Sequence, residues 1–62
     1  MNRDILIQFQ GATVKLVLEG NFALTGVIEA VYDDSILFVT AKKTSLIHFN
    51  RIHEVCMDRR HP

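Results

Sequence analysis

The sequence predicts an all-β domain, a small and strongly bent barrel of five short strands that follows one short helix. Three observations lead to this prediction. From Thr13 onward, apolar and polar residues alternate with a period of two, as in strands with one buried face. Short polar or glycine-containing segments interrupt the alternation at close intervals, as tight turns do, and such a bent meander closes into a small barrel. The chain has 62 residues, which is enough for one domain only.

The N-terminal segment is predicted to be a short helix over residues 2–10. Ile5, Leu6 and Phe9 stand at i, i+1 and i+4, so they share one side of a helix. Gly11 can end the helix in the left-handed conformation. The three consecutive apolar residues at positions 5–7 also suit a strand, and that alternative stays open here.

The first hairpin is predicted to have a three-residue loop, residues 19–21. A two-residue loop at 20–21 would place the large apolar residues of the two strands on opposite faces. The longer loop pairs Leu16 with Leu24 and brings both apolar sets to one face, which is what fixes strand register. Asn21 would then be the left-handed residue of the loop, a conformation that asparagine tolerates.

The second strand is predicted to run to about Tyr32, where the polar turn Asp33-Asp34 leads into a third strand over residues 35–40. We expect a two-residue loop at this turn. The pairs expected on the core face are Ala30 with Leu37 and Ile28 with Val39.

The third strand is apolar on both faces, since Ile36 and Phe38 are then predicted to point away from the core. A chain of this size buries only about 60% of the surface that it exposes when unfolded. Its single cysteine, Cys56, excludes an internal disulfide, and no pattern of paired ligands indicates a structural zinc. A partner subunit is therefore the expected cover for the second face of the strand.

Two further short strands are predicted over residues 45–49 and 52–57, after a turn at 41–44. The domain then spans residues 1–57, and residues 58–62 form a polar tail.

Composition excludes several classes of protein. Seven basic and seven acidic residues cancel, so a strongly basic nucleic-acid coat is excluded, although local patches are not. No apolar run approaches the roughly 20 residues of a membrane span, so no membrane partner is expected. The N-terminus lacks the pattern of a secretory signal, and one lone cysteine fits a reducing compartment, so a cytoplasmic location is expected.

Two short motifs carry a family resemblance. The first motif reads Gly11-x-x-Val14-x-Leu16-x-Leu18, then Gly26-x-Ile28, then Leu37-x-Val39, and the second reads Leu46-Ile47-His48-Phe49-Asn50-Arg51-Ile52, followed by Val55. With the helix, their order and spacing resemble the Sm-like family of Sm proteins, Lsm proteins and the bacterial RNA chaperone Hfq. The resemblance covers nearly all of the chain up to Val55. It implies the Sm-like fold, a five-stranded SH3-like barrel with an N-terminal helix. One departure is that Asn21 stands where the family usually has a glycine.

The resemblance also implies a homo-oligomeric ring, between a pentamer and a heptamer, that binds short single-stranded RNA. In such a ring, the fourth strand of one subunit pairs with the fifth strand of the next. The residues predicted at or near this contact are Ile36, Phe38, Ile47 and Val55.

The positions that bind RNA in the family carry different residues here. The positions matching the uridine-reading residues of Sm proteins are Tyr32, Asp34 and Ile36. Sm proteins have an aspartate at the first of these positions, and a shift of one residue would place Asp33 there. His48 and Phe49 match the Arg-Gly pair of Sm proteins. His48, Phe49 and Asn50 match the Tyr-Lys-His run of Hfq. The fold is therefore implied more directly than RNA binding.

The candidate RNA-binding residues come from these two segments. Aromatic rings stack on unpaired bases, and amide, imidazole and guanidinium groups bind base edges or phosphates. In the alternative interpretation, the aromatic residues belong to a core or an interface and the asparagine forms a turn. The Asp33-Asp34 pair would repel phosphate. The candidates are Tyr32, Asp33, His48, Phe49, Asn50 and Arg51.

No catalytic, metal or cofactor site is predicted, and the protein is expected not to be an enzyme. His53 and Cys56 are three positions apart, which places them on opposite faces of a strand. No nucleophile arrangement can be argued around Cys56. The doublets Lys42-Lys43 and Arg59-Arg60 could contact phosphate or simply keep the surface soluble.

Two functions follow from the sequence. The first is a ring that binds RNA, with one weak site per subunit multiplied by repetition. The second is a ring of the same fold that serves as a structural or protein-interaction scaffold and has lost RNA binding.

Overall fold

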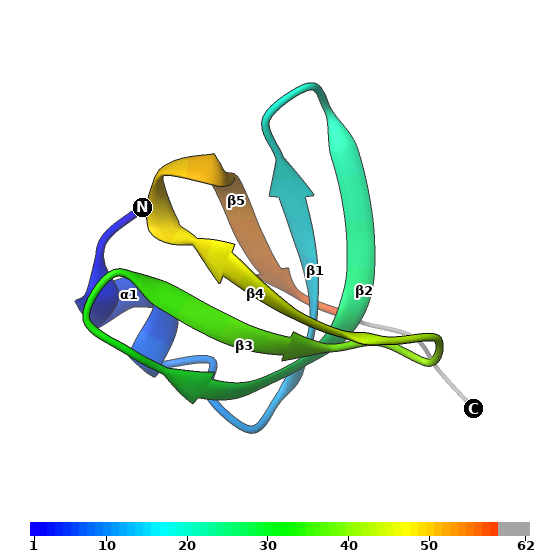
Figure 1. The fold of residues 1–62 in the computed structure, drawn as a ribbon, viewed down its shortest axis with the longest axis horizontal. Helices are drawn as coiled ribbons and strands as arrows, with labels where there is room; N and C mark the ends of the chain where they lie inside the picture. The colour runs from blue at the N-terminus through cyan, green and yellow to red at the C-terminus, as the bar shows by residue number, and fades with distance from the viewer. Residues whose placement is uncertain (59–62) are drawn as a thin grey trace.

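Most of the chain folds into one antiparallel sheet of five strands with the order β4-β3-β2-β1-β5 (Figure 1). The structure is a computed structural model that describes residues 1–58. Of the predicted tail, only Asp58 lies within the described residues, and its N–H donates to the carbonyl of Thr13, which ties it to the start of β1. The elements are α1 (Arg3–Ile7), β1 (Thr13–Leu18), β2 (Phe22–Val31), β3 (Ser35–Val39), β4 (Thr44–His48), the 3₁₀ turn η1 (Phe49–Arg51) and β5 (Ile52–Met57).

The N-terminal segment is a helix, as predicted, but it is shorter than residues 2–10. Asn2 caps it, because its side-chain oxygen accepts the N–H of Ile5 at 3.0 Å. After Ile7 the chain continues in tight turns to Gly11. This glycine has the expected left-handed φ, 85°, but it ends these turns and not the helix itself, whose C-cap is Gln8. Leu6 is completely buried and anchors α1 in the core.

The first hairpin has the predicted three-residue loop. Leu16 pairs with Leu24, and Leu18 pairs with Phe22. Gly20 and Asn21 both have positive φ, 83° and 62°, which lets the loop turn within three residues. The large apolar residues of β1 therefore lie on one face, where they are buried.

The pairing of β2 with β3 corrects the sequence prediction. Ala30 pairs with Leu37 as expected, but Ile28 pairs with Phe38 and not with Val39, because Glu29 is an extra residue in β2. Such a bulge reverses the alternation of faces along its strand. Ile28 and Ala30, two residues apart, consequently face opposite sides of the sheet.

The bulge decides which face of β3 is buried. Ile36 and Phe38 point into the core and are completely buried, whereas Leu37 and Val39 are half-buried on the other face. The prediction that Ile36 and Phe38 point away from the core is therefore wrong. Ile47 is also buried within the chain, and Val55 packs against the core. The second apolar face of β3 thus consists of Leu37 and Val39.

The sheet bends around a small core, and α1 lies against one end of it (Figure 1). The bend brings β3 so close to β2 that a Cβ on Gly26 would clash with the backbone of Val39. Within the described residues, β4 and β5 do not pair, so the sheet is open between its two edges. The fully buried residues with the largest side chains are Phe38, Leu6, Leu16, Ile28, Ile36 and Val14.

The assignment of the two faces of β3 can be tested by truncation. We expect Phe38→Ala to lower the free energy of unfolding by about 3–5 kcal/mol, because it empties a fully buried site. Leu37→Ala should cost about 1 kcal/mol, because this side chain is half-buried. Urea denaturation monitored by circular dichroism measures both. Equal losses, or a larger loss for Leu37→Ala, would contradict the assignment.

Candidate nucleic-acid interface

The two segments that carry the candidate RNA-binding residues lie side by side. The backbone N–H of Phe49 donates to the carbonyl of Asp34 at 2.9 Å. The β3–β4 pairing also sets Ser35 opposite His48. The side chains of His48 and Asp34 come within 3.9 Å, on the surface. The turn between β2 and β3 therefore meets the start of η1.

Tyr32 stands at the entrance of the β2–β3 turn. Its N–H donates to the carbonyl of Ser35 at 2.8 Å, which closes the turn around Asp33 and Asp34. Its carbonyl accepts a hydrogen bond from Arg3 Nε at 3.3 Å, which ties the turn to α1. Tyr32 is 47% exposed, so part of the residue is accessible to a ligand. The geometry suits stacking on a base.

Phe49 differs from Tyr32 because it is half-buried and packs against the core. The alternative interpretation of Phe49 as a core aromatic therefore accounts for much of its environment.

Asn50 follows in η1 and is exposed. Its amide could bind the edge of a base.

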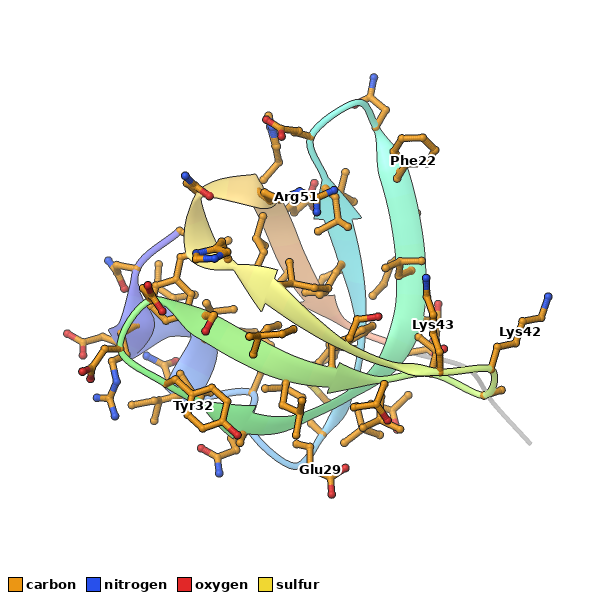
Figure 2. All side chains as sticks on the ribbon, viewed as in Figure 1. Phe22, Glu29, Tyr32, Lys42, Lys43 and Arg51 are labelled. Carbon is orange, nitrogen blue, oxygen red and sulfur yellow. The ribbon has the colours of Figure 1, made fainter. Side chains whose placement is uncertain are left out.

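Arg51 turns away from the other candidates. Its Nε lies 3.9 Å from Glu19 Oε1, and its carbonyl accepts the N–H of Glu19 at 2.9 Å. These contacts tie the end of η1 to the β1–β2 loop. Figure 2 shows Arg51 and Tyr32 in separate parts of the molecule. The structure therefore gathers Tyr32, Asp33 and His48 around one turn and places Arg51 elsewhere.

The charge around the β2–β3 turn is unfavourable for phosphate. Asp33 and Asp34 are both exposed there, and His48 Nδ1 lies 3.9 Å from Asp34 Oδ2. Arg3, whose Nε contacts the carbonyl of Tyr32, is a single cation beside the two carboxylates. The His48–Asp34 and Arg51–Glu19 pairs are long and mostly solvated, so each contributes little to stability. A ligand at this turn would be bound by stacking and by hydrogen bonds to its bases, with little help from charge.

The described residues offer few groups for catalysis or metal binding. Within residues 1–58, no three His, Cys, Asp or Glu side chains lie close enough together to hold a metal ion. Cys56 is partly buried, and its thiol lies 3.9 Å from the carbonyl of Lys15.

The exposure of one aromatic residue differs from the sequence prediction. The three-residue loop predicted for the first hairpin implies that Phe22 shares the face of Leu24, and it does pair with Leu18. It is nevertheless 67% exposed, because it lies at the tip of the hairpin, beyond the reach of the core. Its position directly after the loop was the signal that could have identified it.

No protein-family model matches the chain, and no curated protein matches it significantly. In the part of the chain that the structure describes, no helix has the length and apolar character needed to cross a membrane.

Two substitutions in η1 separate a core role from a surface role. We expect Phe49→Ala to lower the free energy of unfolding by about 1–2 kcal/mol, because part of an aromatic ring is removed from the core. Asn50→Ala should stay within about 0.5 kcal/mol of the parent, as surface substitutions usually do. Thermal and urea denaturation give both values. An unchanged stability in Phe49→Ala would mean that its ring contributes no core packing.

Proposed function

We propose that the chain is an Sm-like protein, with an SH3-like barrel fold, that assembles into a homo-oligomeric ring and binds short single-stranded RNA. The ring would hold five to seven copies, by analogy with the family. The observation that carries the proposal is the strand order β4-β3-β2-β1-β5, which gives each chain two different sheet edges. Two different edges that fit each other form a head-to-tail contact, and such contacts generate rings when the rotation closes.

The edge formed by β4 is ready for pairing with another strand. Hydrogen bonds from Thr40 N–H to the carbonyl of Lys43, and from Phe49 N–H to that of Asp34, fix the phase of the β3–β4 ladder. Backbone groups alternate in direction along an antiparallel strand. Those of Ser45 and Ile47 consequently point toward β3, and those of Thr44, Leu46 and His48 point outward.

The edge formed by β5 has the same property. The hydrogen bond from Asp58 N–H to the carbonyl of Thr13 fixes the phase of the β1–β5 ladder. The backbone groups of Glu54 and Cys56 therefore point toward β1, and those of Val55 and Met57 point outward. Outward groups can pair only with outward groups. Full overlap of the two edges sets Leu46 opposite Val55 of the partner subunit and Thr44 opposite Met57 of the partner subunit.

This register also matches the apolar side chains. Leu46 lies opposite Leu37 on the outer face of its sheet and is 59% exposed. Val55 lies on the core face of β5, opposite Leu16. Directly opposed residues share a face, so the outer face of one subunit at β4 would continue as the core face of the next at β5. The partner would then cover Leu37 and Leu46.

RNA binding by the ring rests on repetition. Each subunit would offer Tyr32 for stacking and Asn50 and His48 for hydrogen bonds to bases. One such site binds RNA weakly. Once an RNA strand is bound at one site of a ring, the neighbouring sites are close to it, so its effective concentration at those sites is high.

A scaffold ring without RNA binding is the second candidate. The exposed Asp33 and Asp34 beside Tyr32 favour it, because they repel a phosphate backbone at this turn. Assembly would use the same two edges.

The proposed contact predicts a disulfide between subunits. Ser45 would lie opposite Cys56 of the partner subunit in a pair without mutual hydrogen bonds, where Cα atoms are about 4.5 Å apart. This separation is within the range of about 4.4–6.8 Å that disulfides require. We therefore expect Ser45→Cys, under mild oxidation, to form covalent oligomers with the native Cys56. Denaturing gels without reductant should show a ladder that ends at the ring size.

Two controls make the cross-link specific. Ser45→Cys combined with Cys56→Ser should give no ladder, and neither should Thr44→Cys, whose position is one residue out of register. A ladder from Thr44→Cys but not from Ser45→Cys would contradict the register. Monomer in native mass spectrometry of the parent protein would overturn the ring.

RNA binding is tested with a short U-rich RNA at low salt. We expect native mass spectrometry to show one RNA per ring, and Tyr32→Ala and Asn50→Ala to weaken binding at least several-fold in fluorescence anisotropy. A ring that binds no RNA at low salt would favour the scaffold function. Equal binding by parent and variants would mean that RNA binding uses other residues.

A further inference from the structure

The pair of strands β3 and β4 carries charges of opposite sign at its two ends. Asp33 and Asp34 form the turn that leads into β3, and Lys42 and Lys43 belong to the turn between β3 and β4. All four residues are exposed. Figure 2 shows Lys42 and Tyr32, the neighbour of Asp33, toward opposite ends of the longest axis of the molecule. The zero net charge of the chain therefore conceals a separation of charge along this axis.

Hydrogen bonds to the backbone hold both turns in place. The Thr40 hydroxyl accepts the N–H groups of Lys42 and Lys43, each at 3.2 Å. The Thr40 N–H also donates to the carbonyl of Lys43 at 2.8 Å. At the other end of β3, the bond from the Tyr32 N–H to the carbonyl of Ser35 closes the acidic turn. The solvated charges are therefore carried by backbone segments with fixed positions.

The two turns are too far apart to neutralise each other. The five residues of β3 separate them, and a strand rises about 3.3 Å per residue, so the distance between the turns is roughly 20 Å. This exceeds the Debye length, which is about 10 Å at about 0.1 M ionic strength. Within residues 1–58, neither Lys42 nor Lys43 forms an ion pair. Arg3 contacts the acidic turn through the Tyr32 carbonyl, but it is one cation beside two carboxylates.

We propose that the Lys42-Lys43 turn of one copy docks on the Asp33-Asp34 turn of another copy, so that assembled rings stack head to tail. The inference rests on the proposed ring, and charge complementarity identifies the partner as a second copy of the chain. A strand runs across the direction in which its neighbours pair. In a ring closed by pairing of β4 with β5, the strands therefore extend from one face of the ring toward the other. The lysine turns then gather on one face and the aspartate turns on the opposite face.

Repetition makes this contact effective. One exposed ion pair contributes little, because water competes for both charges. A ring presents one basic turn per subunit to as many acidic turns, and once one contact has formed the others form at high effective concentration. The contact joins two unlike surfaces by a displacement along the ring axis, so it does not close and builds an open column. Stacking also offsets the repulsion between like charges gathered on each face.

The test uses purified protein freed of nucleic acid, because a bound RNA could bridge two rings. Light scattering and sedimentation velocity give the mass of the assembly at about 0.01 M and about 1 M salt, where the Debye length is about 30 Å and about 3 Å. We expect a multiple of the ring mass at low salt and the mass of a single ring at high salt. Negative-stain electron microscopy at low salt should show columns of rings.

Charge reversal identifies the two partners of the contact. Lys42→Glu with Lys43→Glu makes both turns acidic. Asp33→Lys with Asp34→Lys makes both turns basic. Each double variant should remain as single rings at low salt, whereas a mixture of the two preformed rings should associate, because one supplies the basic turns and the other the acidic turns. Lys15→Glu, at an exposed position on β1, changes the net charge as much as Lys42→Glu does but should associate like the parent.

The outcomes separate this inference from the proposed function. If the parent forms rings that stay single at low salt, or if both double variants associate as the parent does, the inference is overturned and the ring stands. If the parent is a monomer at both salt concentrations, the ring itself fails, and the stacking that rests on it fails too.

Discussion

The bulge at Glu29 is the constraint on which the rest of the sheet depends. One extra residue in β2 reverses which side chains of β2 and β3 point into the core. Phe38 and Ile36 therefore point into the core, and Leu37 and Val39 lie on the outer face. The largest completely buried side chain, Phe38, comes from β3, and a regular β2 strand would have turned it outward. The bend near Gly26 adds to this effect, because the missing side chain there lets the β3 backbone come close.

The outer face that results from the bulge would link the fold to the proposed assembly. Leu37 and Leu46 lie opposite each other across β3 and β4 and end at a sheet edge whose outward backbone groups can pair. An exposed edge with apolar side chains is an aggregation hazard for a monomer. The same edge is an advantage for a chain that meets its own second edge, because pairing removes both hazards together. The charge of the exposed side chains differs between the two ends of the β3–β4 pair. The β2–β3 turn carries Asp33 and Asp34, and the turn between β3 and β4 carries Lys42 and Lys43.

Sequence patterns predicted the parts of the fold that depend on local alternation. The three-residue loop at 19–21 could be derived because only one register put Leu16 and Leu24 on a common face. The helix could be placed from Leu6, and the left-handed residue that ends the turns after it from Gly11, although the helix itself stops earlier, at Ile7. The bulge could not be predicted, because Glu29 fits the alternation of a regular strand equally well. Its position follows from how β3 packs across the core, which is a tertiary effect.

The candidate site was predictable to a similar extent. The meeting of the β2–β3 turn with His48 follows from strand order, and the structure contains it. The separation of Arg51 from Tyr32 could not be read from the sequence, because it depends on the contact between Arg51 and Glu19 across two loops. The exposure of Phe22 could not be predicted from the sequence either. An apolar residue at the start of a strand fits the same alternating pattern whether its side chain packs in the core or lies in solvent.

The curvature at Gly26 has a consequence for symmetry. In a closed assembly of identical chains, the angle between the two edges of one chain must equal the angle by which each copy rotates relative to the next. The bend of β2, which the close approach of Gly26 and Val39 permits, contributes to the angle between the β4 and β5 edges. The number of copies that close the circle would then be determined by backbone shape within a subunit, and the residues at the contact would determine only how firmly it holds.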